Sequence, residues 1–416
     1  MEEWKEYRLG DIISIAGGFA YKGDLIGKGQ NYLLGMGCVS FNENFLDKGA
    51  RQYDGDCPER YYATPGDIVL ATRQQSDNMP ILGMPAIIPS KYEGCKIIVG
   101  ANLYRVELKD TSFDNRFIYW LLKTPSYINY IRSCQSGTTV RMITKSNIED
   151  FIFCAPKKEV RDRISNLIWT LDDKIEVNKR INENLEQQAQ ALFKSWFVDF
   201  EPFKDGEFVE SELGMIPKGW RVRTLGEIGD VIGGSTPSKT KPEYYTEKGL
   251  AWLTPKDLSV SNAKFTEKGE IDITQEGYNS CSTKLMPKGS VLFSSRAPIG
   301  YITIAKNEIC TNQGFKSVVP GYAGTAFIYC FLKATTPDIE NKATGSTFKE
   351  ASGSLMKSLQ LVVAPKDIMD SFEERLKPIF DEQECIEDES RRLATLRDTL
   401  LPKLMSGELK VNEVEI

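Results

Sequence analysis

The sequence predicts an α+β protein in which two mixed α/β domains alternate with two long helices that pair antiparallel as a coiled coil. Two observations predict this fold: the chain contains one unit twice, and each copy ends in a stretch of seven-residue apolar periodicity. The expected limits are 1–155 and 216–365 for the globular parts, and 156–215 and 366–416 for the helical parts. A pseudo-two-fold axis would relate the two halves.

The internal repeat is visible in four pairs of segments that occur in the same order in both halves. The pairs are residues 9–12 with 225–228, 65–73 with 288–296, 137–139 with 345–347, and 153–156 with 362–365. Gly17-Gly18 likewise corresponds to Gly233-Gly234. The ordered matches indicate duplication of a folded unit. A duplicated fold without a shared function is the alternative interpretation.

The globular parts contain short apolar runs between glycine and proline residues, which is typical of strands. Such runs predict strands at residues 67–71, 96–99, 290–293 and 301–305, and longer apolar stretches at 117–122 and 326–332 predict buried helices. These patterns do not predict the order of strands in a sheet.

The helical parts show an apolar seam with the spacing of coiled-coil a and d positions. The residues expected to pair the helices are Ile164, Leu171, Ile175, Asn178, Leu185, Leu192, Leu376, Ile386, Leu393 and Leu400. Each helix would run about 35–40 residues, or about 50–60 Å. Neither can bury its seam alone, so antiparallel pairing within the chain is the simplest solution. An ordinary packing or dimerisation role is the alternative to a spacer role.

Polar residues interrupt this seam and can fix its register, at a cost in stability. Asn178, Asn182, Gln383 and Ser390 occupy such positions. Pro378 predicts a kink or a short preceding helix, and Pro402 should lie close to the end of the last helix.

Composition restricts the class of protein. The chain has no histidine, which excludes a histidine general base, triad or metal ligand within it. Its nine cysteines are scattered without a C-x-x-C pair, and no apolar run reaches the length of a membrane span. The polar N-terminus is unlike a secretory signal, so a reduced, cytoplasmic location is expected.

Charge is unevenly distributed along the chain. The net charge of −6 looks unfavourable for a nucleic-acid-binding protein, but residues 216–365 carry +5 and residues 1–155 only −1. The acidic excess lies in the helical parts, with −4 at residues 156–215 and −6 at 366–416. A surface that faces nucleic acid would therefore be a local patch on the globular parts.

Several motifs resemble the specificity subunits of type I restriction–modification enzymes. Residues 233–238, 242–245 and 252–258 look like the opening of that family's target-recognition domain, 289–300 like its central motif, and 345–349 with 361–365 like its closing segment. The first half departs from the pattern, with residues 17–21 in place of a Gly-Gly-Thr-Pro-Ser opening and Arg73-Gln74-Gln75 in place of Arg-x-Pro-x-Gly. The resemblance covers essentially the whole chain.

This resemblance implies that each globular domain reads one half of a bipartite DNA site. The helices would set the gap and dock two modification subunits, which bind S-adenosylmethionine and methylate adenine. Motor-nuclease subunits would add ATP-driven translocation and cleavage. S-adenosylmethionine, ATP and Mg²⁺ are thus expected on partner subunits and none in this chain. The sequence contains neither a Walker-type phosphate loop nor an Asn/Asp-Pro-Pro-Tyr/Phe methylation motif.

Candidate DNA contacts are polar and basic residues at the predicted strand ends and in neighbouring loops, because these side chains read base edges and phosphates. They are Arg73, Gln74, Gln75, Asn78, Thr138, Arg141 and Lys145 in the first half, and Ser235, Lys239, Lys241, Ser294, Ser295, Arg296, Asn312, Gln313, Thr347 and Lys349 in the second. The two arginines that end the duplicated segment, Arg73 and Arg296, are the strongest candidates.

Two other functions stay open from the sequence. One is a stand-alone nuclease or methyltransferase fragment, which the missing histidine and methylation motifs argue against. The other is a coiled-coil scaffold that carries two domains with protein or sugar ligands.

Overall fold

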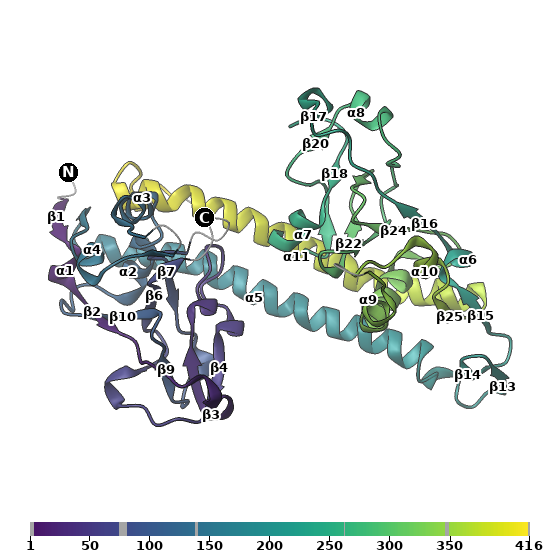
Figure 1. Cartoon of the computed structure of the whole chain (residues 1–416), viewed down its shortest axis with the longest axis horizontal. Helices are drawn as coiled ribbons and strands as arrows, with labels where there is room; N and C mark the ends of the chain where they lie inside the picture. Colours follow the sequence, from purple (N-terminus) through teal and green to yellow (C-terminus); the bar gives the residue numbers. More distant parts are fainter. Residues whose placement is uncertain (1–3, 75–80, 138–139, 262, 346–348, 415–416) are drawn as a thin grey trace. The chain divides into compact units, whose positions relative to one another are not determined.

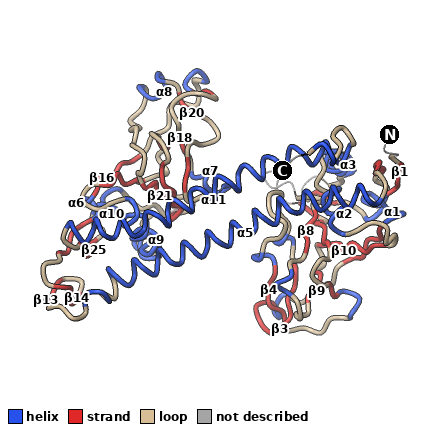
Figure 2. The backbone as a smooth tube through the Cα atoms, turned by 180° about the vertical axis from the view of Figure 1, so that it is seen from behind, coloured by secondary structure: helices blue, strands red, loops and turns tan. Residues whose placement is uncertain are grey.

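The computed structural model describes residues 4–74, 81–137, 140–261, 263–345 and 349–414 (Figures 1 and 2). The chain divides into two compact units: unit 1 is Met1–Ile175 with Arg392–Ile416, and unit 2 is Glu176–Arg391. The boundary falls within the two long helices and not between globular and helical parts, because each globular part packs on one portion of each helix. Each unit is therefore described by itself.

Unit 1 is built on two four-stranded sheets and two smaller strand pairs. The first sheet has the order β2-β10-β6-β8 and the second β4-β3-β9-β5, while β1 pairs with β12 and β7 with β11. The strands are β1 (Lys5–Arg8), β2 (Ile13–Gly17), β3 (Ile26–Leu34), β4 (Ala50–Tyr53), β5 (Tyr62–Ala63), β6 (Ile68–Ala71), β7 (Arg73–Gln74), β8 (Pro85–Ile87), β9 (Ile97–Val99), β10 (Leu103–Leu108), β11 (Arg141–Met142) and β12 (Ile152–Ala155).

Short helices cover the first sheet of unit 1, and a longer helix, α5, follows them. They are α1 (Leu9–Ile12), α2 (Asn115–Leu121), α3 (Pro125–Cys134), α4 (Lys145–Glu149) and α5 (Lys158–Phe197). Asp114 and Thr124 cap α2 and α3 by accepting hydrogen bonds from backbone amides of the first turn. Buried side chains of α2 join those of α5 and the last helix in one hydrophobic core.

Unit 2 contains a five-stranded sheet of order β16-β24-β21-β22-β19 and several strand pairs, namely β13-β14, β15-β25, β17-β20 and β18-β23. The strands are β13 (Phe208–Ser211), β14 (Gly214–Pro217), β15 (Arg221–Thr224), β16 (Gly229–Gly233), β17 (Tyr245–Thr246), β18 (Trp252–Leu253), β19 (Phe265–Thr266), β20 (Asp272–Ile273), β21 (Val291–Ser295), β22 (Ile299–Ala305), β23 (Cys310–Thr311), β24 (Lys316–Pro320) and β25 (Gln360–Val363).

The helices of unit 2 pack around this sheet, except α8, which lies beside the β17-β20 pair (Figure 1). They are α6 (Leu225–Ile228), α7 (Pro255–Ser261), α8 (Gln275–Asn279), α9 (Thr325–Lys342), α10 (Gly353–Lys357) and α11 (Lys366–Ser406). Phe197 of α5 contacts Phe327 of α9 and Phe372 of α11, with ring centroids 4.7 Å and 4.9 Å apart. These rings join the sheet core to both long helices.

The predicted strands and buried helices are confirmed. Strands β6, β9, β21 and β22 and helices α2 and α9 lie where the apolar runs predicted them. All positions of β6 and β21 are buried, and each strand lies inside its sheet with a neighbour on either side.

The two units repeat individual hydrogen bonds as well as motifs. Thr72 donates from its hydroxyl to Asn102 O at 3.0 Å, and Ser295 donates in the same way to Gly314 O at 3.1 Å. A Cβ atom on Gly18 would lie 2.0 Å from Gly100 O, and one on Gly234 would lie 2.1 Å from Asn312 O. The second glycine of each duplicated pair is thus required because another backbone segment approaches too closely for a side chain.

The two long helices bury the predicted seam. Helices α5 and α11 have 40 and 41 residues, close to the expected length. Every predicted pairing residue is buried or half-buried, and Ile164, Leu171, Leu376 and Leu400 are among the most buried. The seven-residue pattern therefore identified the buried face of each helix correctly.

Polar seam residues contact each other across the two helices in unit 2. Asn178 donates from Nδ2 to Glu389 Oε2 at 2.6 Å and to Ser390 Oγ at 3.2 Å. Asn182 Nδ2 and Gln383 Nε2 each donate to the other residue's backbone carbonyl, at 3.4 Å and 3.2 Å. Partner numbers fall along α11 as they rise along α5, so these segments of unit 2 run in opposite directions.

Of the two predictions made from prolines in α11, one is wrong and one agrees with the structure. Helix α11 runs unbroken through Pro378, so the predicted short helix before the main one is wrong. It ends at Ser406, and Pro402 accordingly lies in its final turns as expected.

Among the described residues, no helix is both long and apolar enough to cross a membrane.

Candidate nucleic-acid interface

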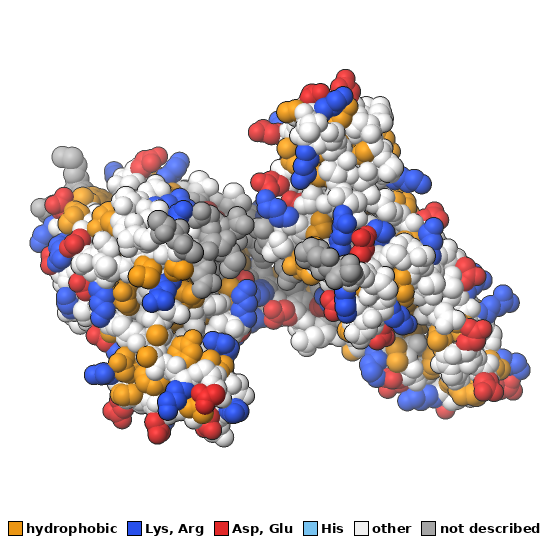
Figure 3. Space-filling view, in the orientation of Figure 1, with side chains coloured by type: hydrophobic (Ala, Val, Ile, Leu, Met, Phe, Trp, Pro, Cys, Tyr) orange, Lys and Arg blue, Asp and Glu red, His pale blue; other side chains and the backbone are white. Residues whose placement is uncertain are grey.

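The face drawn in Figure 3 shows lysine and arginine side chains interspersed with acidic and apolar ones in both units. A candidate interface therefore has to be found from the local arrangement of residues and not from an unbroken basic field.

Unit 2 has a groove of about 820 Å³ that gathers several of the predicted residues. It lies beside the ends of β18, β21 and β23. Its lining includes Thr236, Lys239, Tyr245, Trp252, Lys256, Asp257, Glu270, Arg296, Asn312 and Gln313. We call this set the unit 2 groove. It combines cations, amides and aromatic rings, which are the groups that contact phosphates and base edges.

The strip from Ser235 to Lys239 forms one wall of the groove and is fixed by backbone contacts. Ser235 N donates to Thr311 O at 2.9 Å, and Trp252 Nε1 donates to Ser235 O at 3.2 Å. Tyr245 donates from its hydroxyl to Pro237 O at 2.7 Å. Because these bonds hold the strip, the exposed Lys239 extends from a positioned backbone.

Arg296 follows β21 directly and is part of a small charge cluster. Its Nη1 lies 3.5 Å from Glu350 Oε2, and Lys316 Nζ lies 3.2 Å from Glu350 Oε1. The arginine side chain is 36% exposed, so water or a ligand can reach it. One carboxylate is shared between two cations, which leaves a net positive charge at this edge of the groove.

Unit 1 brings together the equivalent segments by pairing β7 with β11, in which Met142 lies opposite Arg73 and Arg141 opposite Gln74. Lys145 Nζ lies 5.9 Å from the centre of the Tyr104 ring. Burial raises the pKa of Tyr104, and the nearby Arg73 charge opposes that rise. Arg73 and Lys145 thus lie near Tyr104, and Arg141 lies on the strand that pairs with that of Arg73 and donates to Gln135 Oε1 at 3.2 Å. We call Tyr104 and these three cations the unit 1 cluster.

Three predicted contacts are corrected by burial. Ser294 and Ser295 are 0% exposed, and Gln74 is 7% exposed. Ser294 donates from its hydroxyl to Pro298 O and Ser295 to Gly314 O, while Gln74 Oε1 accepts from Leu82 N. Their side chains hold the strand ends together, so the prediction that they contact DNA is wrong for this arrangement.

Other predicted residues make internal contacts while lying at the surface. Lys241 donates to the Tyr244 hydroxyl, a bond that raises the Lys241 pKa. Asn312 Oδ1 accepts from Gly314 N at 2.8 Å, which leaves its amide nitrogen for a ligand. Lys349 donates to Glu340 O at 3.3 Å, away from the unit 2 groove. The predicted residues Gln75, Asn78, Thr138 and Thr347 lie outside the described residues.

Sequence reasoning missed Lys316, Glu350, Tyr104 and Lys256 as parts of these sites. Lys316 and Glu350 are separated by 34 residues and meet only through the folded chain. Lys256 pairs with Glu270 at the groove edge, and this bond raises the Lys256 pKa. The sequence offered a signal for two of them, since Lys256 lies in the motif at residues 252–258 and Lys316 follows the predicted contacts Asn312 and Gln313. Within the described residues, no group of three or more cysteine, aspartate or glutamate side chains is arranged to hold a metal ion.

This duplicated fold, with a polar edge on each globular part, defines a protein with two related candidate binding domains. Residues 1–187 and 217–388 match the family model described as the type I restriction modification DNA specificity domain, and the chain belongs to that family. The resemblance predicted from the sequence motifs is confirmed.

Similarity to individual proteins supports this family assignment. The chain is 26% identical over 476 residues to the HindI specificity subunit of Haemophilus influenzae, a match that covers 98% of this chain and 100% of the relative. It is 42% identical to the MjaIX specificity subunit of Methanocaldococcus jannaschii over 158 residues, or 37% of this chain and 36% of that protein. The S subunit structure from M. genitalium has the same fold, with 16% identity, a TM-score of 0.60, and coverage of 97% and 96%.

Proposed function

We propose that this chain is the non-catalytic, sequence-specific DNA-binding subunit of a type I restriction–modification complex. In this proposal each globular part reads one half of a bipartite site. The observation that carries it is that the unit 2 groove and the unit 1 cluster each contain the arginine that ends the same duplicated segment, Arg296 and Arg73.

The chemistry of these sites fits duplex DNA. An arginine can donate two hydrogen bonds to the major-groove edge of guanine, and an asparagine or glutamine can bond adenine. Arg296, Asn312 and Gln313 line one groove, while Lys239 and Lys256 at its rim are suited to phosphates. In unit 1, Arg73 is exposed and Arg141 half-buried on neighbouring strands.

The helices fit the role of a spacer that also docks partners. Helices α5 and α11 each continue from one unit into the other, and we infer that they pair as an antiparallel coiled coil with pseudo-two-fold symmetry. In the complex they would set the gap between half-sites and bind two methyltransferase subunits. S-adenosylmethionine would bind those subunits, and ATP and Mg²⁺ would serve motor-nuclease subunits where the host has them.

The test begins with mapping methylated adenines in host DNA with and without this gene, which gives the candidate site. The complex of this chain with its modification subunits is then titrated with the intact duplex and with duplexes in which one half-site is scrambled. We expect each scrambled half to abolish specific binding. Equal binding to all duplexes, or no methylation that depends on the gene, would contradict the proposal.

Two alanine variants test which globular part reads which half of the DNA site. Arg73→Ala and Arg296→Ala should each weaken specific binding by about 1–3 kcal/mol and relax the sequence preference at one base pair in one half-site. Lys218→Ala, at an exposed ion pair outside both sites, is the matched control. Unchanged affinity and preference in both arginine variants would exclude them as base contacts.

The enzyme alternative has a separate test. The isolated chain is incubated with DNA, Mg²⁺ and S-adenosylmethionine, and we expect neither methylation nor cleavage until the partner subunits are added. Activity of the chain alone would favour a stand-alone enzyme.

A further inference from the structure

Lys264 is a buried cation at the junction between the globular part of unit 2 and both long helices. It directly precedes β19, the edge strand of the five-stranded sheet, and its side chain is only 7% exposed. Lysine is rarely buried without a specific set of partners, because its charge loses hydration. The burial of this charge therefore indicates that specific partners compensate for its lost hydration.

The Lys264 ammonium contacts both helices at once. Its Nζ lies 2.8 Å from Glu186 Oε2 on α5 and donates to Gln383 Oε1 on α11 at 2.7 Å. It also lies 3.5 Å from the ring centre of Phe380 and 4.2 Å from that of Tyr329. One side chain thus joins the sheet edge to two helices in a largely dry environment, where such contacts are strong.

The Lys264 backbone is held just as firmly. The amides of Lys264 and Phe265 donate to the two carboxylate oxygens of Glu387 at 2.9 Å and 3.1 Å. The Lys264 carbonyl accepts from Ile304 N at 2.7 Å and from the Thr303 hydroxyl at 3.1 Å. The residue therefore connects α11 to the middle of the sheet through its main chain as well as its side chain.

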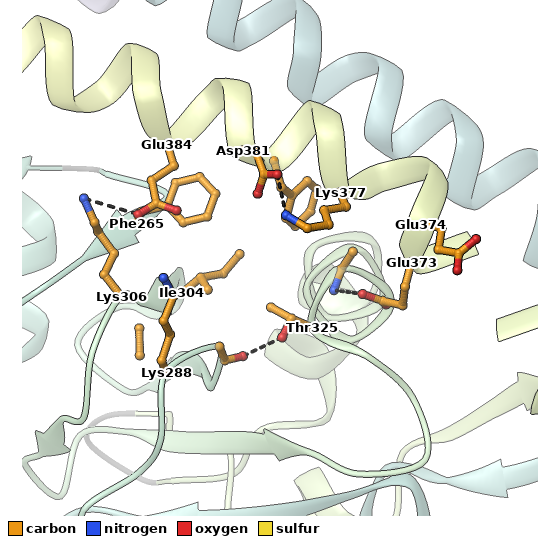
Figure 4. Close-up of a pocket in the computed structure, with 14 residues that line it drawn as sticks. Phe265, Lys288, Ile304, Lys306, Thr325, Glu373, Glu374, Lys377, Asp381 and Glu384 are labelled. Atoms are coloured by element: carbon orange, nitrogen blue, oxygen red, sulfur yellow. Dashed lines mark hydrogen bonds and ion pairs between the residues drawn. The ribbon is translucent and has the colours of Figure 1, made fainter. Parts of the chain in front are cut away.

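A pocket open to solvent adjoins this junction. A cavity of about 290 Å³ lies between α11 and the sheet, with Phe265, Ile304 and Phe380 among its walls (Figure 4). At one side Lys306 reaches Glu384 at 3.4 Å, and at the other Glu373 accepts from the first amides of α9. Phe265, Ile304 and Phe380 also belong to the main hydrophobic core of unit 2, so the polar bonds of Lys264 add directional contacts to side-chain packing at this junction.

We propose that Lys264 is a positioning residue that fixes the orientation of the unit 2 globular part on the helix pair, and so sets which gap between half-sites is accepted. This inference rests on the proposed DNA-reading function. A buried polar contact that links three elements gives orientation more than stability, because an apolar replacement can pack equally well but allows several angles.

The test uses the complete complex with modification subunits and a series of duplexes whose gap is native, one base pair shorter or one base pair longer. The variant pairs Lys264→Met with Glu186→Gln, because removing the lysine alone would leave a half-buried carboxylate without its cation. The control is Lys377→Met on α11, an exposed lysine that lines the cavity and forms an ion pair with Asp381 of its own helix.

The expected result is a change in gap preference. The double variant should bind the native site roughly tenfold more weakly, while its preference for the native gap over the altered gaps falls by a similar factor. Lys377→Met should retain both. If the double variant fails to fold, Glu186→Gln alone replaces it, with a smaller loss of gap preference expected.

The outcomes separate the two claims. Unchanged gap preference in a folded variant that still binds DNA would overturn the role of Lys264 and leave the proposed function intact. Failure of the unaltered complex to bind any duplex in the series would contradict the proposed function itself.

Discussion

The two globular parts have the same strand plan but different residues at the edge where we propose that DNA binds. In unit 2, Arg296 faces the carboxylate of Glu350. Met142 holds the equivalent position in unit 1, opposite Arg73, and is 41% exposed. The duplicated backbone thus presents an arginine in both units. The acidic partner of that arginine, Glu350, is present in unit 2 and is replaced by Met142 in unit 1.

A second difference shows how a cation can be supplied from different elements. In unit 1, Lys145 at the start of α4 lies over Tyr104, close to Gly17. In unit 2 the equivalents of Lys145 and Tyr104 are Gly353 and Lys316, and Lys316 lies close to Gly233. Both units therefore place a lysine side chain beside the first glycine of the pair, although a different element carries that lysine in each unit.

The third difference lies where α5 and α11 meet within each unit. Asp172 and Arg397 form a buried ion pair in unit 1, with side chains 7% and 11% exposed. The equivalent positions in unit 2 hold Phe380 and Ala189, both buried and apolar. The same pair of positions in the repeat is thus filled by an ion pair in unit 1 and by apolar side chains in unit 2.

The largest expected effect is on this ion pair. Asp172→Ala should lower the free energy of unfolding by about 3 kcal/mol, the lower end for breaking a buried pair, because it removes the buried carboxylate beside Arg397 while the exposed Asp398 stays paired with it. The double variant Asp172→Phe with Arg397→Ala, which copies unit 2, should recover most of that loss. Urea denaturation of the three proteins measures both values. A double variant no more stable than Asp172→Ala would show that the ion pair and the apolar pair are not interchangeable.

The next effect concerns the acid beside Arg296. Glu350→Met, which copies unit 1, should strengthen DNA binding by about 1 kcal/mol, since the exposed ion pair that it removes contributes little to stability and its loss frees two cations. The reverse change, Met142→Glu, should weaken binding through unit 1. Glu382→Met on α11 controls for net charge. Equal affinities for Glu350→Met and Glu382→Met would show that the effect is not local.

A pH dependence of stability is expected from Lys123, a half-buried lysine of unit 1. Burial lowers the pKa of Lys123 in unit 1 to about 8, against an unfolded value near 10.5. Between these values the unfolded chain binds more protons, so this lysine makes the free energy of unfolding rise as pH increases from about 8. Lys123→Met should remove that rise when the two proteins are compared over the same pH series. Parallel curves would contradict the lowered pKa.

The smallest effect is expected at the rim of the unit 2 groove. Lys239→Ala should reduce the slope of log affinity against log salt by about 0.9 and weaken binding similarly for matched and mismatched sequences. A titration at several salt concentrations measures the slope, with Lys218→Ala as the exposed control. A change in sequence preference would instead indicate that Lys239 contacts a base.

Local patterns predicted much of the fold. Apolar runs identified β6, β9, β21 and β22, and the seven-residue spacing identified the buried face of α5 and α11. Sheet order was not predictable because it depends on contacts between distant segments. The function class followed from motifs in a fixed, repeated order, and the family match confirms that class.

The individual site residues were harder to predict. Ser294 and Ser295 look like polar loop residues in the sequence, yet they complete a strand whose every position is buried. A serine in the sequence does not show whether its hydroxyl donates to a neighbouring carbonyl or is exposed to a ligand. The pairing of Arg296 with Glu350 spans 54 residues and depends on the folded chain.

The contact between Glu373 and the start of α9 has a consequence for how the protein is made. The carboxylate that satisfies the Ala326 amide comes 47 residues later in the chain, on the last helix. During translation, α9 therefore begins with unsatisfied amides, and Phe327 lacks its neighbour Phe372, until α11 emerges. A chain that stops before Lys366 would lack both contacts, so the second unit is complete only after α11 has been synthesised.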